Sequence, residues 1–72
     1  MYNYILKIDG MSCLMCEAHV NDVIRNNFDI KKVKSSHKKN ETLIVTNNKL
    51  DEEKLKDVLH KIGYEVLEIG TE

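Results

Sequence analysis

The stretch Gly-Met-Ser-Cys-Leu-Met-Cys, residues 10–16, holds both cysteines of this 72-residue chain. A strand-like run precedes it, in which Tyr4, Leu6 and Ile8 fall on one face by simple alternation. Gly10 interrupts that alternation, and a helical spacing of apolar residues begins around the cysteines. The sequence therefore predicts a β-strand that turns directly into a helix at a pair of thiols.

The first predicted helix runs from about Leu14 to Asn27. Its apolar face is expected to consist of Cys16, Val20, Val23, Ile24 and Phe28. Ser12 is expected to cap the start of this helix, because serine oxygens accept hydrogen bonds from free N–H groups there. Asn26-Asn27 is expected to form a frayed end, since asparagine tolerates the left-handed conformation.

The second half of the chain predicts two strands, a helix and a closing strand. The two strands occupy residues 30–38 and 42–46, and Lys39-Asn40 forms the turn between them. Asp51 caps the second helix and Gly63 lies past its last turn. The buried face of that helix is expected to consist of Leu55, Val58, Leu59 and Ile62. The closing strand occupies residues 64–69.

These elements follow in the order βαββαβ. This order predicts an α+β, ferredoxin-like sandwich, with two helices on one face of a four-stranded antiparallel sheet, and a single domain over residues 1–72. When the chain direction is followed, three connections share one end of the fold: the cysteine turn, the hairpin tip at 38–40 and the loop at 62–64. Tyr64 and the hairpin lysines are therefore expected near Cys13 and Cys16.

Charge and hydropathy argue against several classes of partner. The chain has 11 Lys and Arg against 12 Asp and Glu, and this formal net charge of -1 gives no reason to expect nucleic acid. No apolar run approaches the roughly 20 residues that span a bilayer, and the N-terminus lacks the regions of a secretory signal. We therefore expect a cytoplasmic protein without membrane insertion, whose cysteines are thiols.

Cys13 and Cys16 form a Cys-x-x-Cys turn at a helix start, where backbone N–H groups and the helix dipole favour thiolates. Two thiolates without an obvious third ligand suit a soft ion, Cu(I) above all, better than zinc, which takes about four protein ligands in structural sites. The same turn also suits a thiol–disulfide oxidoreductase. Thioredoxin-like folds carry a cis-proline beside the pair, whereas this chain has no proline. Metal binding is therefore favoured, and no enzyme activity is expected.

The motif at residues 10–16, combined with this element order, resembles the Gly-Met-x-Cys-x-x-Cys signature of heavy-metal-associated domains. That family includes bacterial copper chaperones and the N-terminal domains of copper-transporting P-type ATPases. Residues 62–66, Ile-Gly-Tyr-Glu-Val, are similar to the Gly-Tyr segment after the family's second helix. The resemblance implies that Cys13 and Cys16 bind Cu(I) and pass it by thiolate exchange to a P-type ATPase or a similar acceptor. Because similar domains handle other metals, a carrier or sensor of mercury, zinc or cadmium is the alternative.

Several residues near the motif have candidate roles. The resemblance implies that Met11 is a buried prop beneath the turn and that Tyr64 lies near the metal. For Tyr64, half-buried core at the start of the last strand is the alternative. Leu14 and Met15 stand where many family members have small or polar residues, and Met15 is expected to contact partners rather than the metal. His19 lies one helical turn after the second cysteine, so a third ligand is geometrically possible, but a solvated histidine is the more ordinary outcome.

The predicted hairpin is basic. His37 and the lysines are expected to line a solvated strand face and turn, the lysines being Lys31, Lys32, Lys34, Lys38 and Lys39. At the cysteine end of the fold, such lysines would steer an acidic docking surface toward the site. Asn40 stands where the family often has glycine, which we interpret as tolerated turn chemistry. We expect a monomer, and a dimer bridged by the metal is the alternative.

Overall fold

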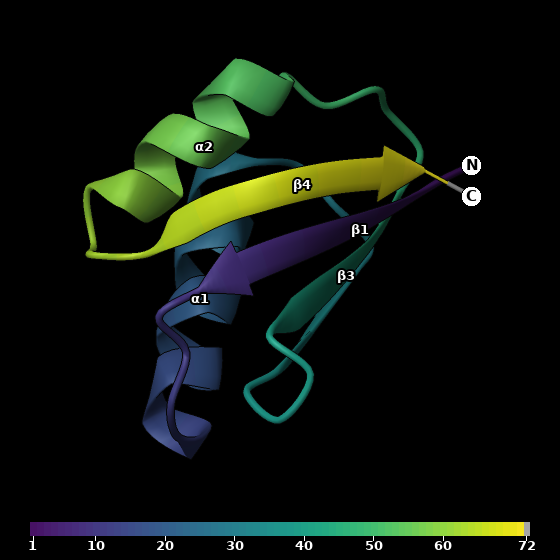
Figure 1. The fold of residues 1–72 in the computed structure, drawn as a ribbon. Coiled ribbons are helices and arrows are strands. Elements are labelled where there is room, and N and C mark those ends of the chain that lie inside the picture. The colour runs from purple at the N-terminus through teal and green to yellow at the C-terminus, as the bar shows by residue number, and fades with distance from the viewer. Residues whose placement is uncertain (72) are drawn as a thin grey trace.

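The computed structural model describes residues 1–71, which form four strands and two helices. The elements are β1 (Tyr2–Asp9), α1 (Leu14–Asn27), β2 (Lys32–Ser36), β3 (Glu41–Thr46), α2 (Glu52–His60) and β4 (Glu65–Thr71). All strand pairs are antiparallel, and the sheet order is β2-β3-β1-β4 (Figure 1). The ferredoxin-like βαββαβ prediction is therefore confirmed.

The core lies between the sheet and the two helices. Alternation along β1 places Tyr4, Leu6 and Ile8 on the helix side, and all three are buried, as predicted. The helices contribute one buried pair each, Val20 and Ile24 from α1 and Leu55 and Leu59 from α2. Their spacing of four residues brings each pair onto one helix face. Both faces pack against the buried residues of the sheet, so the chain has one continuous core.

The buried face of α2 is narrower than the sequence predicts. Val58 is only half-buried, and Ile62 is 40% exposed. The reason is that the helix ends at His60, so Ile62 lies in the following turn and not on a helix face. The prediction that Ile62 is buried is therefore wrong.

Several element boundaries also differ from the predictions. β2 covers only Lys32–Ser36 of the predicted 30–38, because residues 37–40 form the turn itself. β4 begins one residue later and extends to Thr71. The α1 range agrees with the prediction, but Cys13 occupies its N-cap position, not Ser12, and no side chain caps it. The predicted left-handed asparagine end is also wrong, since the helix ends in extended backbone at Phe28.

The start and the end of α2 agree with the predicted turn chemistry. The Asp51 carboxylate accepts hydrogen bonds from the backbone N–H groups of Glu53 and Lys54. Gly63 has a φ of 93° in the turn that follows, a backbone conformation that glycine adopts without steric cost. The Tyr64 N–H then bonds to the Leu59 carbonyl oxygen at 3.0 Å, which fixes where β4 starts.

The three connections that direction tracing assigns to one end do meet there. The Ile8 N–H bonds to the Asn40 carbonyl oxygen at 2.8 Å, which joins the end of β1 to the hairpin tip. A Cβ built on Gly10 would lie 3.1 Å from the Tyr64 ring, so the loop after α2 is in contact as well. Figure 1 shows the end of β1, the start of α1 and the β2–β3 turn at this end.

Neither of the helices described in residues 1–71 combines the length and the apolar content that crossing a bilayer requires.

Candidate metal-binding site

Cys13 and Cys16 lie together at the start of α1, with their Sγ atoms 3.4 Å apart. The helix itself creates this proximity. The Cys13 carbonyl oxygen accepts the N–H groups of Cys16 at 3.1 Å and of Glu17 at 3.3 Å, so the chain closes its first turn around the pair. Cys13 is exposed and Cys16 is half-buried. One sulfur is therefore open to a partner while the other is held against the protein.

Hydrogen bonds lower the pKa of the Cys16 thiol from 9.0 to about 6. The largest cause is the backbone amide of Ser12, followed by the Tyr64 hydroxyl and the Cys13 thiol, while partial burial opposes the shift. Each of these donors stabilises negative charge on sulfur. Cys16 is therefore mainly a thiolate at neutral pH, as both metal binding and nucleophilic attack require.

Tyr64 is the third residue of the site. Its side chain is 8% exposed, and its hydroxyl donates to the Cys16 sulfur. That bond, together with burial and the nearby sulfurs, raises the pKa of Tyr64 to about 12, so the phenol keeps its proton. The structure thus brings Tyr64 to the cysteines, as direction tracing predicts, and adds that it contacts Cys16.

Gly10 makes this arrangement possible. Its φ is 110°, a backbone conformation that side chains rarely adopt. A Cβ there would also approach the Tyr64 ring at 3.1 Å and the Gly63 carbonyl oxygen at 3.5 Å. Glycine is thus required at this position for both conformation and space.

The other sequence candidates separate into buried and exposed residues. Met11 is 4% exposed and belongs to the core beneath the turn, as predicted. Leu14 and Met15 are 72% and 69% exposed, so two large apolar side chains project beside the cysteines. His19 is exposed, and no group of three or more His, Cys, Asp or Glu suited to a metal occurs within residues 1–71.

The hairpin tip approaches the site through contacts that the sequence does not reveal. Glu17 directly follows Cys16, and its carboxylate Oε2 accepts the backbone N–H of His37 at 2.9 Å and the ring Nδ1–H of the same residue. The backbone bond is the largest cause of the lowered pKa of Glu17. His37 is thus half-buried against α1, and the prediction that it lies on a solvated face is wrong. Twenty residues separate the two partners, so only the element order signals their contact.

The basic residues of the hairpin remain exposed. Lys38 and Lys39 lie at the tip, on the same end of the fold as the cysteines. Within residues 1–71 neither lysine forms an ion pair, and the same holds for Lys31, Lys32 and Lys34. Their charge is therefore available to a partner.

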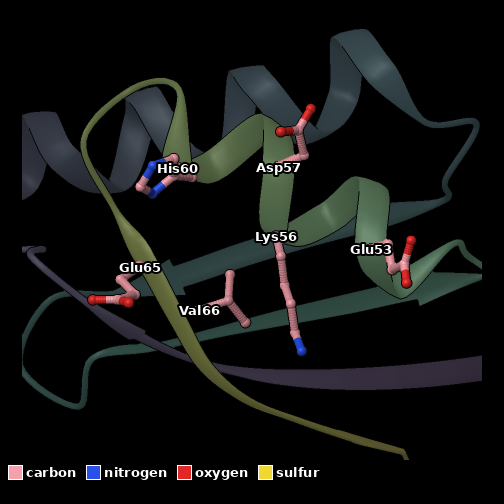
Figure 2. Close-up of a pocket in the computed structure, with 6 residues that line it drawn as sticks. All are labelled: Glu53, Lys56, Asp57, His60, Glu65 and Val66. Atoms are coloured by element: carbon pink, nitrogen blue, oxygen red, sulfur yellow. The ribbon is translucent and has the colours of Figure 1, made fainter.

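A hollow of about 350 Å³ lies elsewhere, between α2 and β4. It is lined by Glu53, Lys56, Asp57, His60, Glu65 and Val66. Figure 2 shows the Asp57 carboxylate and the Lys56 ammonium on opposite sides of α2, and Glu53 and Glu65 far from each other. These groups do not converge on a common point, so the cysteine turn is the better candidate site.

Comparison with solved structures identifies proteins of the same fold. The CopZ metallochaperone superposes with a TM-score of 0.81 at 23% identity, over 90% of this chain and 98% of its own. The N-terminal domain of ZntA in its Zn(II) form superposes with a TM-score of 0.80 at 22% identity, over 90% of this chain and 88% of that domain. The yeast copper transporter domain Ccc2a superposes with a TM-score of 0.78 at 24% identity, over 94% of this chain and 97% of that domain.

No profile of a protein family matches the sequence, and no curated protein matches it significantly. At these identities the structural matches establish the architecture. The fold expected from the motif and the element order is confirmed, because this chain shares the architecture of a metallochaperone, of a domain solved in its Zn(II) form and of a copper transporter domain.

Proposed function

We propose that this chain is a heavy-metal-associated domain that binds Cu(I) through Cys13 and Cys16. The observation that carries the proposal is the pair of sulfurs 3.4 Å apart, one of which is a thiolate at neutral pH. Thiolates are soft ligands that select Cu(I), and two of them suffice for an ion of low coordination number. Structural zinc, by contrast, takes about four ligands, and residues 1–71 offer no larger ligand group.

The same geometry supports delivery of the ion to another protein. Because Cys13 is exposed at the N-cap, an incoming thiolate reaches the ion from solvent while Cys16 still holds it. Successive replacement of one protein's thiolates by the other's then moves Cu(I) without chemical turnover. The acceptor is a copper-transporting P-type ATPase or a similar metal-accepting protein, to which this chain delivers the ion from the cytoplasm. Leu14 and Met15 provide an adaptable apolar contact beside the ion.

Cu(I) titration tests this proposal. Anaerobic competition against a chromophoric Cu(I) chelator is expected to give one tight site per chain, which Cys13→Ser and Cys16→Ser each abolish without unfolding the protein. His19→Ala is the matched control, because His19 is exposed on the same helix, and it is expected to bind as tightly as the wild type. Tight binding retained in either serine variant contradicts the ligand set.

The identity of the metal needs a second measurement. The structural neighbours include a domain in its Zn(II) form as well as copper proteins. Zn(II), Cd(II), Hg(II) and Cu(I) should therefore compete for the site in the presence of chelators of known affinity. Preference for Cu(I) over Zn(II) is expected, because two thiolates leave zinc short of ligands.

A thiol–disulfide oxidoreductase is the second candidate function. The separation of 3.4 Å between the sulfurs and the lowered pKa of Cys16 also suit disulfide exchange. An insulin-reduction assay distinguishes the two functions. We expect no turnover above that of free dithiol, and robust turnover combined with weak copper binding would instead identify the redox enzyme.

A further inference from the structure

The β2–β3 hairpin tip, residues 37–40, contacts the cysteine turn on both sides of the thiol pair. On one side, the Asn40 side-chain nitrogen donates to the Met11 carbonyl oxygen at 3.0 Å when the amide is oriented toward it. On the other side, the Glu17 carboxylate accepts two hydrogen bonds from His37. Met11 and Glu17 flank the segment that contains both cysteines. One tip therefore holds both ends of that segment.

Four of the five residues between Met11 and Glu17 are exposed. Ser12, Cys13, Leu14 and Met15 are all exposed, and no side chain caps the start of α1. The Cys13 sulfur is thus exposed, whereas Cys16 is half-buried and accepts a hydrogen bond from Tyr64. Two fixed ends limit how far the intervening residues can move, and they limit the separation of the sulfurs in the same way.

Asn40 contributes more than its backbone conformation. Its φ is 53°, which glycine would adopt more easily. Glycine, however, has no amide to donate to Met11, nor to the His37 carbonyl oxygen, 3.3 Å from the same nitrogen. The same side chain therefore binds the cysteine turn and orders the tip around His37. The interpretation of Asn40 as tolerated turn chemistry alone is too narrow.

We propose that His37 and Asn40 are positioning residues for the thiol pair. They act through the Glu17 carboxylate and the Met11 carbonyl oxygen and keep Cys13 and Cys16 at the separation that the ion requires. This inference rests on the proposed metal-binding function. It adds two residues that help to set the affinity of the cysteine pair for Cu(I). Groups that orient metal ligands from outside the ligand set are typically worth about 10-fold to 100-fold in affinity.

A neighbouring polar contact supplies a matched control. Asn21 lies one helical turn beyond Glu17 on the same side of α1. Its Oδ1 accepts a hydrogen bond from Ser35 at 2.6 Å, and Ser35 contacts Thr42 at 2.8 Å. The contact of Glu17 with His37 and the contact of Asn21 with Ser35 both attach α1 to the β2–β3 hairpin, but only the contact of Glu17 lies beside a cysteine. Asn21→Ala therefore reports the effect of loosening α1 without loosening the cysteine turn.

The test compares His37→Ala, Asn40→Gly and their double variant with Asn21→Ala. For each chain, Cu(I) affinity is measured by chelator competition, and unfolding of the metal-free form is measured in urea. The double variant is expected to bind Cu(I) at least about 10-fold more weakly, a loss typical of outer contacts at metal sites. Asn21→Ala is expected to lose stability but to keep its Cu(I) affinity.

Amide hydrogen exchange of the metal-free chain provides a readout that does not depend on the function. The N–H groups of Cys16 and Glu17, which bond to the Cys13 carbonyl oxygen, are expected to exchange faster in the double variant and unchanged in Asn21→Ala. If the wild type binds no Cu(I), the proposed function fails, and exchange alone decides whether the tip holds the turn. Unchanged exchange in the double variant, or equal loss of Cu(I) affinity in Asn21→Ala, overturns the inference. If the double variant does not fold, Asn40→Gly alone decides by the same measurements.

Discussion

At the scale of single residues, the bond from Tyr64 to Cys16 links the chemistry of the site to a distant part of the sequence. The phenol donates to the sulfur, is itself largely buried, and remains protonated because its pKa is raised to about 12. It is therefore a permanent donor over the whole physiological pH range. The sequence places Tyr64 at this end of the fold, but only the packing of its ring at Gly10 aims the hydroxyl at Cys16.

Removing the Tyr64 hydroxyl is expected to raise the pKa of Cys16. In Tyr64→Phe the thiolate loses one of its donors, although the bond from Ser12, the larger contribution, remains. Alkylation of Cys16 by iodoacetamide, followed by mass spectrometry across pH, should move its midpoint from near 6 toward higher pH. Tyr2→Phe, at an exposed tyrosine, is the control and should leave the midpoint in place. A midpoint that does not move in Tyr64→Phe shows that the hydroxyl does not reach the sulfur.

The same thiolate makes the stability of the metal-free chain depend on pH. The pKa of Cys16 falls from 9.0 to about 6 on folding, so this contribution is complete above pH 9 and is lost as the pH falls through 6. The Tm difference between wild type and Cys16→Ser should therefore grow in favour of the wild type from pH 6 to pH 9. A difference that stays constant over this range contradicts a thiolate in the folded protein.

Gly10→Ala is expected to disturb both the backbone and the site. A side chain at a φ of 110° costs about 1–3 kcal/mol of stability. Gly63→Ala is a matched control, because its φ is 93° but no atom lies within 4 Å of the added Cβ. Urea unfolding should show a loss in both variants, whereas only Gly10→Ala should also change the alkylation of Cys16. If both variants change alkylation equally, Tyr64 is not held by the space at Gly10.

At the scale of elements, the two helices begin in different ways. Asp51 caps α2 with two hydrogen bonds, whereas the start of α1 has no side-chain cap and is occupied by Cys13. The N-cap position of α1 is thus occupied by Cys13, one of the two thiols, and not by a residue whose side chain caps the helix. Besides its core residues, two polar contacts attach α1 to the β2–β3 hairpin, Glu17 to His37 and Asn21 to Ser35.

Asp51→Ala and Ser12→Ala are expected to differ in effect. Loss of an N-cap side chain typically costs about 0.5–2 kcal/mol, and Asp51→Ala should lower the free energy of unfolding by that amount. Ser12→Ala should be nearly neutral, because the backbone of Ser12 and not its hydroxyl bonds to Cys16. Urea denaturation of the metal-free proteins measures both. Equal losses would show that Ser12 caps α1 in solution.

At the scale of the whole molecule, the fold gathers at one end the thiol pair, the exposed apolar residues Leu14 and Met15, and the basic hairpin tip. The net charge of -1 conceals this arrangement, because it averages over all faces of the chain. A partner that approaches the cysteines therefore meets positive charge at Lys38 and Lys39.

Charge reversal at the tip is expected to slow transfer of Cu(I) to an acidic acceptor domain. Lys38→Glu should lower the association rate at low salt, and added salt should reduce the difference from wild type by screening. Lys49→Glu makes the same change of charge in the β3–α2 connection, away from the cysteines, and should have little effect. Stopped-flow measurement of transfer tests both. Equal rates for Lys38→Glu and the wild type at low salt would falsify the steering role.

The sequence by itself determines the order of the elements, the range of α1, the cap at Asp51 and the end of the fold that holds the cysteines. These depend on periodicity, turn residues and chain direction, which are local properties. Only the tertiary structure decides that Tyr64 bonds to Cys16 and that His37 and Asn40 bind the cysteine turn. Each of these contacts joins residues far apart in the chain, and their geometry is set by how helices and hairpin pack on the sheet rather than by neighbouring residues.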